Sequence, residues 1–270
     1  MVYSAKNHVL HLADKSMDYV TFGRGEKPLV MIPGLGDGLA TVRGMAQSIS
    51  FLYRRLGRDY KVYVFSRMNE LPVGCSTRDM AGDLARAMTA LGLTQTPVLG
   101  ISQGGMIAQW LALDFPDKVS RLLLAVTTAR ANELSRERVG HWMRLAQADQ
   151  YQDLMADIGQ HSYSSRTYAC LKYLYKLMGF FGKIKNKERL LIQAQACKEH
   201  DARAELARIF CPTLIVGAKM DDVLGLEASY ELNRIIENSR LIVLPDCGHA
   251  LYEKNKEFQQ LVLEFLESNQ

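Results

Sequence analysis

Ser102 stands between Gly100 and Gly104 in the stretch "VLGISQGGMIAQWLA", where a helix is expected to follow a strand. The short apolar run before the serine is typical of a buried strand, and the apolar spacing after it predicts a helix that ends before Pro116. A turn this abrupt leaves room only for very small side chains two residues either side, as the glycines provide. It also presents the hydroxyl and the first N–H groups of the helix to a bound molecule. The pattern predicts a nucleophile.

Two later strands end in residues that could activate a serine hydroxyl. The apolar run "PTLIVG" is followed by Asp221 and Asp222, and "RLIVLPD" is followed by His249. Because the carboxyl ends of parallel strands share one edge of a sheet, an aspartate, His249 and Ser102 should meet there, in the chain order Ser–Asp–His. A histidine can take the serine proton, and a carboxylate can orient the histidine. The spacing therefore predicts a Ser–His–Asp triad, with one of the two aspartates as its acid.

The composition is that of an ordinary globular protein. The chain has 270 residues, 48% of them hydrophobic, and a formal net charge of +4, which is too small to indicate nucleic acid as a partner. No apolar run approaches the ~20 residues of a membrane span, and the first residues have no apolar core of signal-peptide length. Five scattered cysteines without a C-x-x-C pair favour reduced thiols. We expect a cytoplasmic protein that binds a small molecule and does not contact a membrane.

Strands and helices are expected to alternate through most of the chain. Apolar runs bounded by turn residues predict strands, and longer segments with helical spacing predict helices. This alternation favours an α/β fold with a mostly parallel central sheet and helices on both of its faces. The expected strands are 17–23, 28–33, 61–66, 96–101, 119–128, 212–217 and 240–246, and the expected helices are 39–56, 76–93, 106–115, 226–237 and 257–268.

The alternation stops after about residue 129 and resumes near residue 209. Residues 130–208 contain helical patterns rich in Tyr, Met, Lys and Arg, and no convincing strand. A helical segment that interrupts an α/β sheet is typical of an insertion that covers the core. We therefore expect an α/β core formed by residues 1–129 and 209–270, with residues 130–208 as an inserted helical cap. The histidines expected on the surface or within the cap are His141, His161 and His200.

The predicted cap has more large apolar side chains than a thin layer needs to remain attached. Some of them should therefore face a substrate pocket and select a mainly apolar group. Residues 166–189 interleave lysines with apolar residues, which fits either a membrane-surface helix or a cap helix with its apolar face on the active site. We favour the cap helix. The candidate apolar and aromatic residues are Trp142, Met143, Met155, Tyr163, Tyr168, Tyr173, Tyr175, Phe180 and Phe181.

Four stretches of the chain resemble the α/β-hydrolase superfamily: "VMIPGLGDG", "GISQGGMIAQWLALDFPDKV", "CPTLIVGAKMDD" and "LPDCGHALYEK". They are spread over nearly the whole chain, and the serine and histidine stretches are the most specific. Within the superfamily the sequence is most similar to compact bacterial serine hydrolases with a helical cap. That group includes esterases, thioesterases, C–C hydrolases and cofactor-free haloperoxidases, so the resemblance implies an α/β-hydrolase fold and a hydrolytic triad.

The resemblance also implies an oxyanion hole formed by two backbone N–H groups. In the family one belongs to the residue after the nucleophile, here Gln103, and the other to a loop near the start of the chain, where it matches Leu35. Many relatives have His-Gly where this chain has Pro33 and Gly34. That difference argues against a side-chain role at position 33 and leaves the backbone role intact.

The spacing of two glycines, compared with the family pattern, favours Asp221 over Asp222 as the acid. Counted forward from Gly217, relatives place the acid three residues on, at Met220 here. Counted back from Gly225, where many relatives have proline, it falls four residues earlier, at Asp221. A one-residue insertion before Asp221 reconciles the two counts. Asp222 is then expected to be solvated or to cap the following helix.

Together these residues predict a serine hydrolase that cleaves a carboxylic ester of a mainly apolar, small or medium substrate through an acyl-enzyme. Thioester hydrolysis, C–C bond hydrolysis and perhydrolysis by the same triad remain alternatives, as does a non-catalytic ligand-binding protein on the same fold. Epoxide hydrolases and haloalkane dehalogenases are disfavoured, because those relatives carry Asp where Ser102 stands. No cofactor or metal is expected, since His8 and His11 have no acidic or cysteine partner nearby.

Overall fold

The computed structural model describes residues 4–13, 15–181, 184 and 186–268. Within these residues the chain forms one eight-stranded sheet in the order β1-β2-β4-β3-β5-β6-β7-β8. The strands β1 and β2 form an antiparallel edge, and β3 to β8 run parallel to one another, which confirms the mostly parallel sheet. The strands are β1 (Lys6–Leu12), β2 (Lys15–Phe22), β3 (Lys27–Ile32), β4 (Tyr60–Met68), β5 (Thr96–Ile101), β6 (Val119–Ala125), β7 (Thr213–Ala218) and β8 (Ser239–Leu244).

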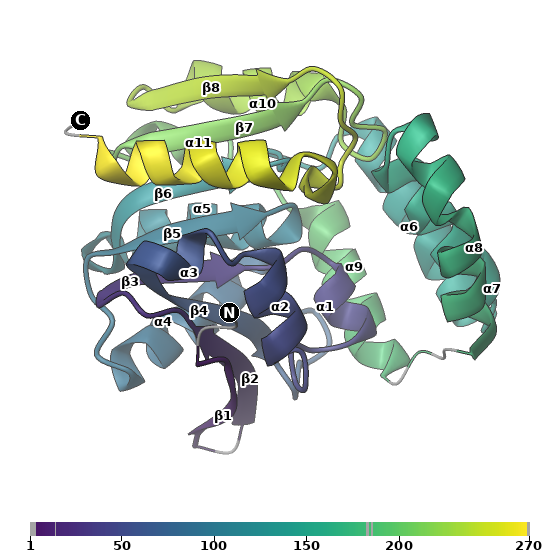
Figure 1. Ribbon diagram of the computed structural model, residues 1–270, viewed down its shortest axis with the longest axis horizontal. Coiled ribbons are helices and arrows are strands. Elements are labelled where there is room, and N and C mark those ends of the chain that lie inside the picture. The colour runs from purple at the N-terminus through teal and green to yellow at the C-terminus, as the bar shows by residue number, and fades with distance from the viewer. Residues whose placement is uncertain (1–3, 14, 182–183, 185, 269–270) are drawn as a thin grey trace.

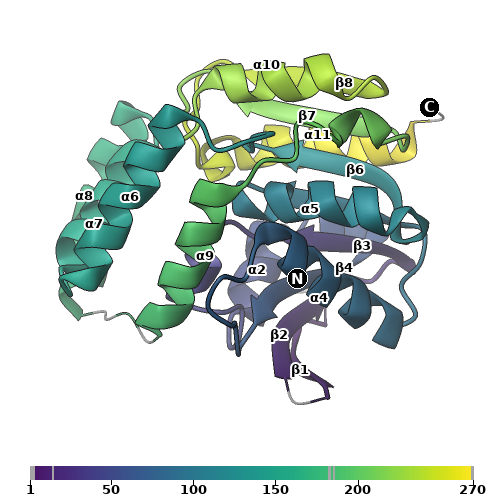
Figure 2. The same cartoon turned by 180° about the vertical axis from the view of Figure 1, so that it is seen from behind.

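Helices cover both faces of this sheet, as the alternation predicted. In Figure 1 α11 and α3 lie in front of the sheet, and Figure 2 shows α4, α5 and α10 on the opposite face. The α-helices are α1 (Gly36–Leu39), α2 (Ala46–Leu52), α3 (Leu56–Asp59), α4 (Thr77–Ala90), α5 (Gln103–Asp114), α6 (Glu133–Gln147), α7 (Tyr151–Ser162), α8 (Ser165–Phe181), α9 (Lys187–Glu199), α10 (Leu226–Ile235) and α11 (Asn255–Glu267).

The hydrophobic core is divided between the two faces of the sheet because neighbouring residues of a strand point in opposite directions. In β5, Val98 packs in the cluster that includes Met88 of α4, while Leu99 packs in the cluster that includes Phe258 of α11. All four of these side chains are at most 1% exposed. The strand that leads to Ser102 is therefore fixed from both sides.

The single helix expected over residues 39–56 is wrong, because the chain forms the three short helices α1, α2 and α3 in this region. Side chains of two strands, β1 and β4, take backbone N–H groups that a continuous helix needs for itself. Ser66 Oγ accepts a hydrogen bond from Val42 N–H at 2.9 Å, and Asn7 Oδ1 accepts one from Gly44 N–H at 2.8 Å. Gly44 also has a φ of +82°, which no residue of a right-handed helix adopts.

The strand expected over residues 119–128 is shorter in the structure, where β6 ends at Ala125. The next residue, Val126, has a φ of +41°, a left-handed value that ends the extended backbone. Its N–H still donates to the carbonyl of Val216 in β7 at 2.9 Å. The chain thus leaves the sheet abruptly, directly beside the turn at Ser102, and enters the inserted helices.

Four α-helices, α6 to α9, and a short 3-10 helix (Leu206–Arg208) lie between β6 and β7 within the described part of the chain. Figures 1 and 2 show α6, α7 and α8 as a layer beside one end of the sheet, with α9 between this layer and the rest of the molecule. Among the contacts of α9 are those with α6 and with α1. In the residues described, no helix has the length and apolar character to cross a membrane. The limits of a separate cap at 130 and 208 stay a prediction.

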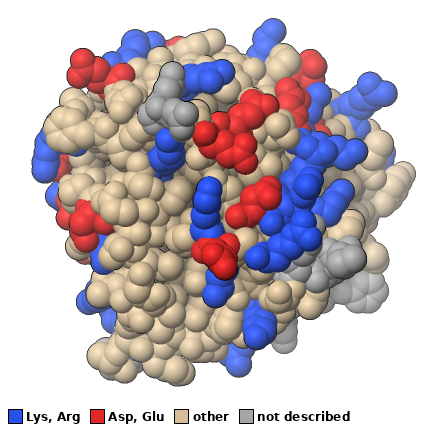
Figure 3. Space-filling model, turned by 60° about the vertical axis from the view of Figure 1, so that its left-hand side comes forward, with Lys and Arg blue, Asp and Glu red and all other residues tan. Residues whose placement is uncertain are grey.

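Charged side chains are unevenly distributed over the surface. On the face shown in Figure 3, Lys and Arg side chains gather in one region, and Asp and Glu side chains lie directly beside them. Because the two signs are interleaved, this face does not present the continuous basic surface typical of nucleic-acid binding. The distribution agrees with the small net charge of +4.

Candidate active site

Ser102 occupies the strained turn between β5 and α5. It has φ +54° and ψ −120°, and its carbonyl accepts a hydrogen bond from the Thr127 hydroxyl at 2.7 Å. A Cβ atom at Gly104 would lie 2.0 Å from the carbonyl oxygen of Ile32, and one at Gly100 would lie 2.4 Å from the carbonyl oxygen of Gly104. Both distances are far below van der Waals contact, so only glycine fits at these positions. The glycines predicted from the sequence thus have a direct steric reason.

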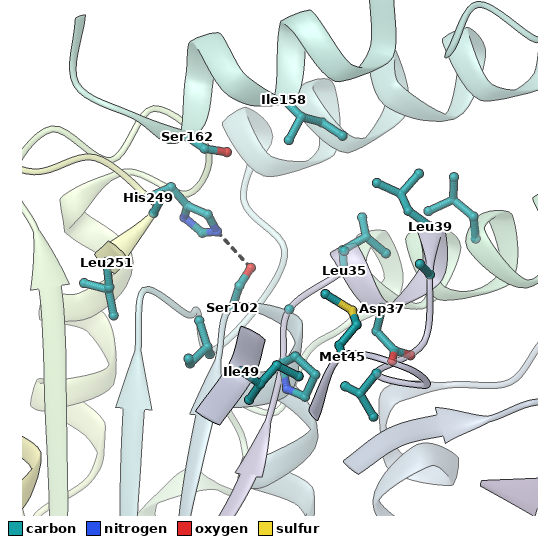
Figure 4. A pocket seen from close by; sticks show the side chains of 18 of the residues that line it. Leu35, Asp37, Leu39, Met45, Ile49, Ser102, Ile158, Ser162, His249 and Leu251 are labelled. Atoms are coloured by element: carbon teal, nitrogen blue, oxygen red, sulfur yellow. Dashed lines mark hydrogen bonds between the residues drawn. The ribbon is translucent and has the colours of Figure 1, made fainter. Parts of the chain in front are cut away.

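Ser102, His249 and Asp221 form a continuous chain of hydrogen bonds. The Oγ atom of Ser102 lies 2.9 Å from Nε2 of His249, and Nδ1 of His249 lies 2.9 Å from Oδ2 of Asp221. Figure 4 shows the imidazole directed at the serine oxygen. With its proton on Nδ1, the imidazole has a free lone pair on Nε2 to accept the serine proton. The geometry is that of a serine nucleophile with a histidine base.

Asp221 is held by its own loop as well as by His249. Its Oδ1 atom accepts hydrogen bonds from the backbone N–H groups of Val223 and Leu224, both at 2.9 Å. Burial by itself raises the pKa of the Asp221 carboxyl, but the charge and hydrogen bond of His249 and the two N–H groups outweigh burial and leave the pKa below its usual value. The carboxylate is therefore ionised at neutral pH and oriented toward Nδ1.

The loop after β3 lies against the serine. A Cβ atom at Gly34 would sit 3.2 Å from Ser102 Cβ and 3.7 Å from Ser102 Oγ, so a larger residue at this position would crowd the serine. Leu35 follows and lines the same cavity as Ser102, and Figure 4 shows it on the side of Ser102 away from His249. Gln103 is the first residue of α5, where a backbone N–H has no partner within the helix. The side-chain amide of Gln103 is buried and donates to the carbonyl of Gln193 at 2.7 Å, so it is directed at α9 and not into the cavity.

A buried ionic cluster supports this loop, and sequence reasoning missed it. The Arg189 guanidinium donates to the Asp37 carboxylate at 2.6 Å and to the carbonyls of Met68 and Arg67 at 3.0 and 3.1 Å. Arg67 in turn donates to the carbonyl of Pro33. Burial lowers the pKa of Arg67 to about 10, although Asp37 opposes that shift. The cluster fixes both ends of the loop that contains Leu35. Asp37 lay in the stretch "VMIPGLGDG" and Arg189 at the end of the stretch 166–189, but no sequence pattern paired the two.

A cavity of about 610 Å³ opens above Ser102 and His249. Of the cap residues expected to face it, Trp142, Met143, Tyr163 and Tyr175 do. Four other candidates do not line it: Met155 is 5% exposed, Tyr168 donates to the carbonyl of Ala156, and Tyr173 and Phe180 are 70% and 72% exposed. The side chain of Phe181, the last candidate, lies outside the described residues. The lining residues contributed by the cap also include Leu154, Ile158, Ser162, Leu190 and Ala194.

The expected placement of α8 is therefore only partly right. Tyr175 faces the cavity, but the apolar side chains of Leu174 and Leu177 are 51% and 54% exposed. The helix packs closely on α7, because a Cβ atom at Gly159 of α7 would lie 2.9 Å from the rings of both Tyr168 and Tyr175. One side of α8 therefore suffices for packing, and apolar residues on its outer side remain in solvent.

Asp222 and two of the cap histidines have roles that the sequence did not indicate. Of the two expectations for Asp222, exposure to solvent holds, since its side chain is 58% exposed, and capping of α10 is wrong. Its carboxylate also contacts His161 of α7 and, at 3.6 Å, Arg138 of α6, which ties the loop of Asp221 to the cap. His200 is buried rather than exposed, with Nδ1 2.9 Å from the Thr77 hydroxyl, and burial lowers its pKa to about 4. Among the described residues no cluster of three or more potential metal ligands is found.

Comparison with known proteins assigns the family. Residues 27–256 match the family model of the alpha/beta hydrolase fold. The chain is 31% identical over 239 residues to a Cronobacter sakazakii protein named as carbamate hydrolase RutD, covering 84% of this chain and 85% of that one. It is 26% identical over 257 residues to 3-oxoadipate enol-lactonase 2 of Acinetobacter baylyi, covering 92% of each. A solved structure of MGS-M2, an alpha/beta hydrolase enzyme from a deep-sea metagenome library, matches with a TM-score of 0.88 at 20% identity, covering 97% and 98% of the two chains.

This chain belongs to the α/β-hydrolase fold family. The family and the fold expected from the four sequence stretches are thereby confirmed. Its bacterial relatives are named as hydrolases of small molecules, and the protein is an α/β hydrolase.

Proposed function

We propose that the protein is a serine hydrolase that cleaves a carboxylic ester through Ser102, His249 and Asp221. The observation that carries this proposal is the unbroken chain of hydrogen bonds from Asp221 through His249 to Ser102, with 2.9 Å at each of its two steps. A protein that only bound a ligand has no use for a hydroxyl, an imidazole and a buried carboxylate in this order.

The proposed reaction follows from the roles of these atoms. His249 Nε2 takes the Ser102 proton while Oγ attacks the ester carbonyl, and the backbone N–H groups of Leu35 and Gln103 hold the resulting oxyanion. The imidazolium, stabilised by Asp221, then gives its proton to the leaving alcohol, and an acyl-enzyme remains. A water molecule, deprotonated by His249, attacks the acyl carbonyl. The imidazolium returns that proton to Ser102 Oγ as the bond from the acyl carbon to Oγ breaks, which releases the acid and the free serine.

The apolar lining of the cavity supports a small or medium substrate with a mainly apolar part, and residues 130–208 act as the cap that covers it. A carbamate or a lactone passes through the same kind of tetrahedral oxyanion as an ester. The names of the relatives make both of these worth testing, together with thioesters. The cytoplasmic location favoured by the scattered cysteines stays a prediction.

A fluorophosphonate probe tests the proposal. We expect covalent labelling of Ser102 in the native protein and no labelling in Ser102→Ala, which keeps the fold. A panel of p-nitrophenyl esters, acyl-CoA thioesters, aryl carbamates and lactones then ranks the reactions by kcat/KM. Absence of labelling in the folded native protein, with no turnover in the panel, would support a ligand-binding protein instead.

A further inference from the structure

The core contributes a second apolar part of the cavity, beside the one formed by the cap. It comes from residues 39–53, the region in which the expected helix is broken. Because Ser66 and Asn7 capture the N–H groups of Val42 and Gly44, this segment bends and turns apolar side chains toward Ser102. The segment residues that line the cavity include Leu39, Val42, Met45, Ile49, Leu52 and Tyr53.

The described residues give this part of the cavity no cationic side chain that could pair with a carboxylate. Among the described residues that line the cavity there is no Lys or Arg, and Asp37 is the one carboxylate. The Asp37 carboxylate already accepts from Arg189, and neither Arg189 nor Arg67 reaches the cavity lining. A carboxylate on the substrate would lose its hydration here without gaining a cation, which disfavours its binding.

The direction of the cavity decides which part of an ester would bind in this segment. The leaving alcohol oxygen must lie at His249 Nε2 to receive its proton, so the acyl chain extends away from the imidazole. Figure 4 shows His249 on one side of Ser102 and the side chains of Met45 and Ile49 on the other. Both of these side chains line the cavity.

We propose that residues 39–53 form the acyl pocket of the enzyme, and that it takes an uncharged, apolar acyl chain and limits its length. The proposal rests on the ester hydrolysis proposed above and names the part of the substrate that the core selects. It differs from the sequence-based expectation, which placed substrate selection in the cap alone.

The test places a larger side chain in the acyl pocket, at a position of α2 that faces the cavity. In Ile49→Trp the indole occupies the space of a longer acyl chain, because Ile49 faces the cavity. Phe51→Trp is the matched control, since the Phe51 side chain is 64% exposed on the same helix. Two ester series are compared, one with acyl groups from acetyl to dodecanoyl and a fixed alcohol, the other with acetyl and alcohols of increasing length.

We expect Ile49→Trp to lower kcat/KM for the long acyl esters by about 100-fold and to leave acetyl esters and the alcohol series within about threefold. Phe51→Trp should leave both series unchanged. In the native protein, an acyl chain that ends in a carboxylate should react at least about 100-fold more slowly than a methyl-ended chain of equal length. Met45→Trp, at a side chain that is 42% exposed, repeats the test if Ile49→Trp does not fold.

The outcomes separate this proposal from the reaction itself. If Ile49→Trp and Met45→Trp shift the alcohol series, or shift neither series while Ser102 is still labelled by the fluorophosphonate, the acyl pocket lies elsewhere. Equal rates for the carboxylate-ended and methyl-ended chains would overturn the preference for an uncharged chain. If the folded native protein is neither labelled nor active, the proposed ester hydrolysis fails first, and the acyl pocket fails with it.

Discussion

Replacing Asp221 by asparagine separates the two functions of its carboxylate. Oδ1 accepts from the N–H groups of Val223 and Leu224, and Oδ2 faces Nδ1 of His249 at 2.9 Å. In Asp221→Asn the amide oxygen can stay at the Oδ1 position and keep both loop hydrogen bonds. The amide NH2 group then points at His249 Nδ1, so the change acts on the imidazole and spares the fold.

The expected loss follows from the tautomer of His249. Because the amide NH2 group of the asparagine is a donor, Nδ1 of His249 must accept a hydrogen bond from it. The imidazole proton then lies on Nε2, where it points at Ser102 Oγ. Nε2 can then no longer take the serine proton. In triads of this geometry, the wrong tautomer lowers kcat by about 10⁴-fold, equivalent to about 5 kcal/mol of activation free energy. We expect this loss for Asp221→Asn, with a thermal unfolding midpoint close to that of the native protein.

Asp222→Asn is the matched control, one residue along the same loop. Its carboxylate is 58% exposed and contacts His161 and Arg138 instead of His249. An exposed ion pair contributes at most about 1 kcal/mol, so kcat/KM for a p-nitrophenyl ester should stay within about fivefold. The reasoning would be refuted if Asp222→Asn caused the larger loss, or if folded Asp221→Asn kept more than about a tenth of native activity.

Three further perturbations test the site and its support. Ser102→Ala and His249→Ala should each lower kcat by about 10⁴-fold or more without unfolding the protein, as measured by kinetics and circular dichroism; substantial turnover in either contradicts the mechanism. In urea titrations, Gly104→Ala should lower the free energy of unfolding by about 3 kcal/mol or more, because its Cβ would lie 2.0 Å from a backbone oxygen. The control Gly82→Ala, with open space around its Cβ, should raise the free energy of unfolding by about 0.5–1 kcal/mol. Burial lowers the pKa of His200 from 6.5 to about 4, so between these pH values the unfolded chain binds a proton at His200 and the folded chain does not. The free energy of unfolding should therefore fall by about 3 kcal/mol as the pH is lowered from 6.5 to 4. His200→Gln should reduce that pH dependence, and an unchanged slope would contradict the assignment.

The sequence predicted that the sheet is mostly parallel, but it did not predict the order of the strands. Continuous apolar runs such as "VLGI" and "LIVG" indicated buried parallel strands, and their alternation with helices placed the residues that follow them at one edge. The helix over residues 39–56 failed because its apolar spacing was helical while its N–H groups were taken by Ser66 and Asn7, which lie far away in the chain. No local pattern records such a competition. The same holds for the burial of His200, which depends on Thr77 and α5.

The sequence by itself determined the identity and the order of the candidate catalytic groups. A glycine pair around Ser102, and Asp221 and His249 each after a strand, are local patterns, because steric limits at a tight turn and the end of a strand involve only neighbouring residues. The tertiary structure alone decided their distances, the paired arginines beneath the loop of Leu35, and the apolar segment that lines the cavity. These depend on contacts between residues far apart in the chain, from Val42 with Ser66 to Asp37 with Arg189, whose geometry is set by the packing of the whole sheet.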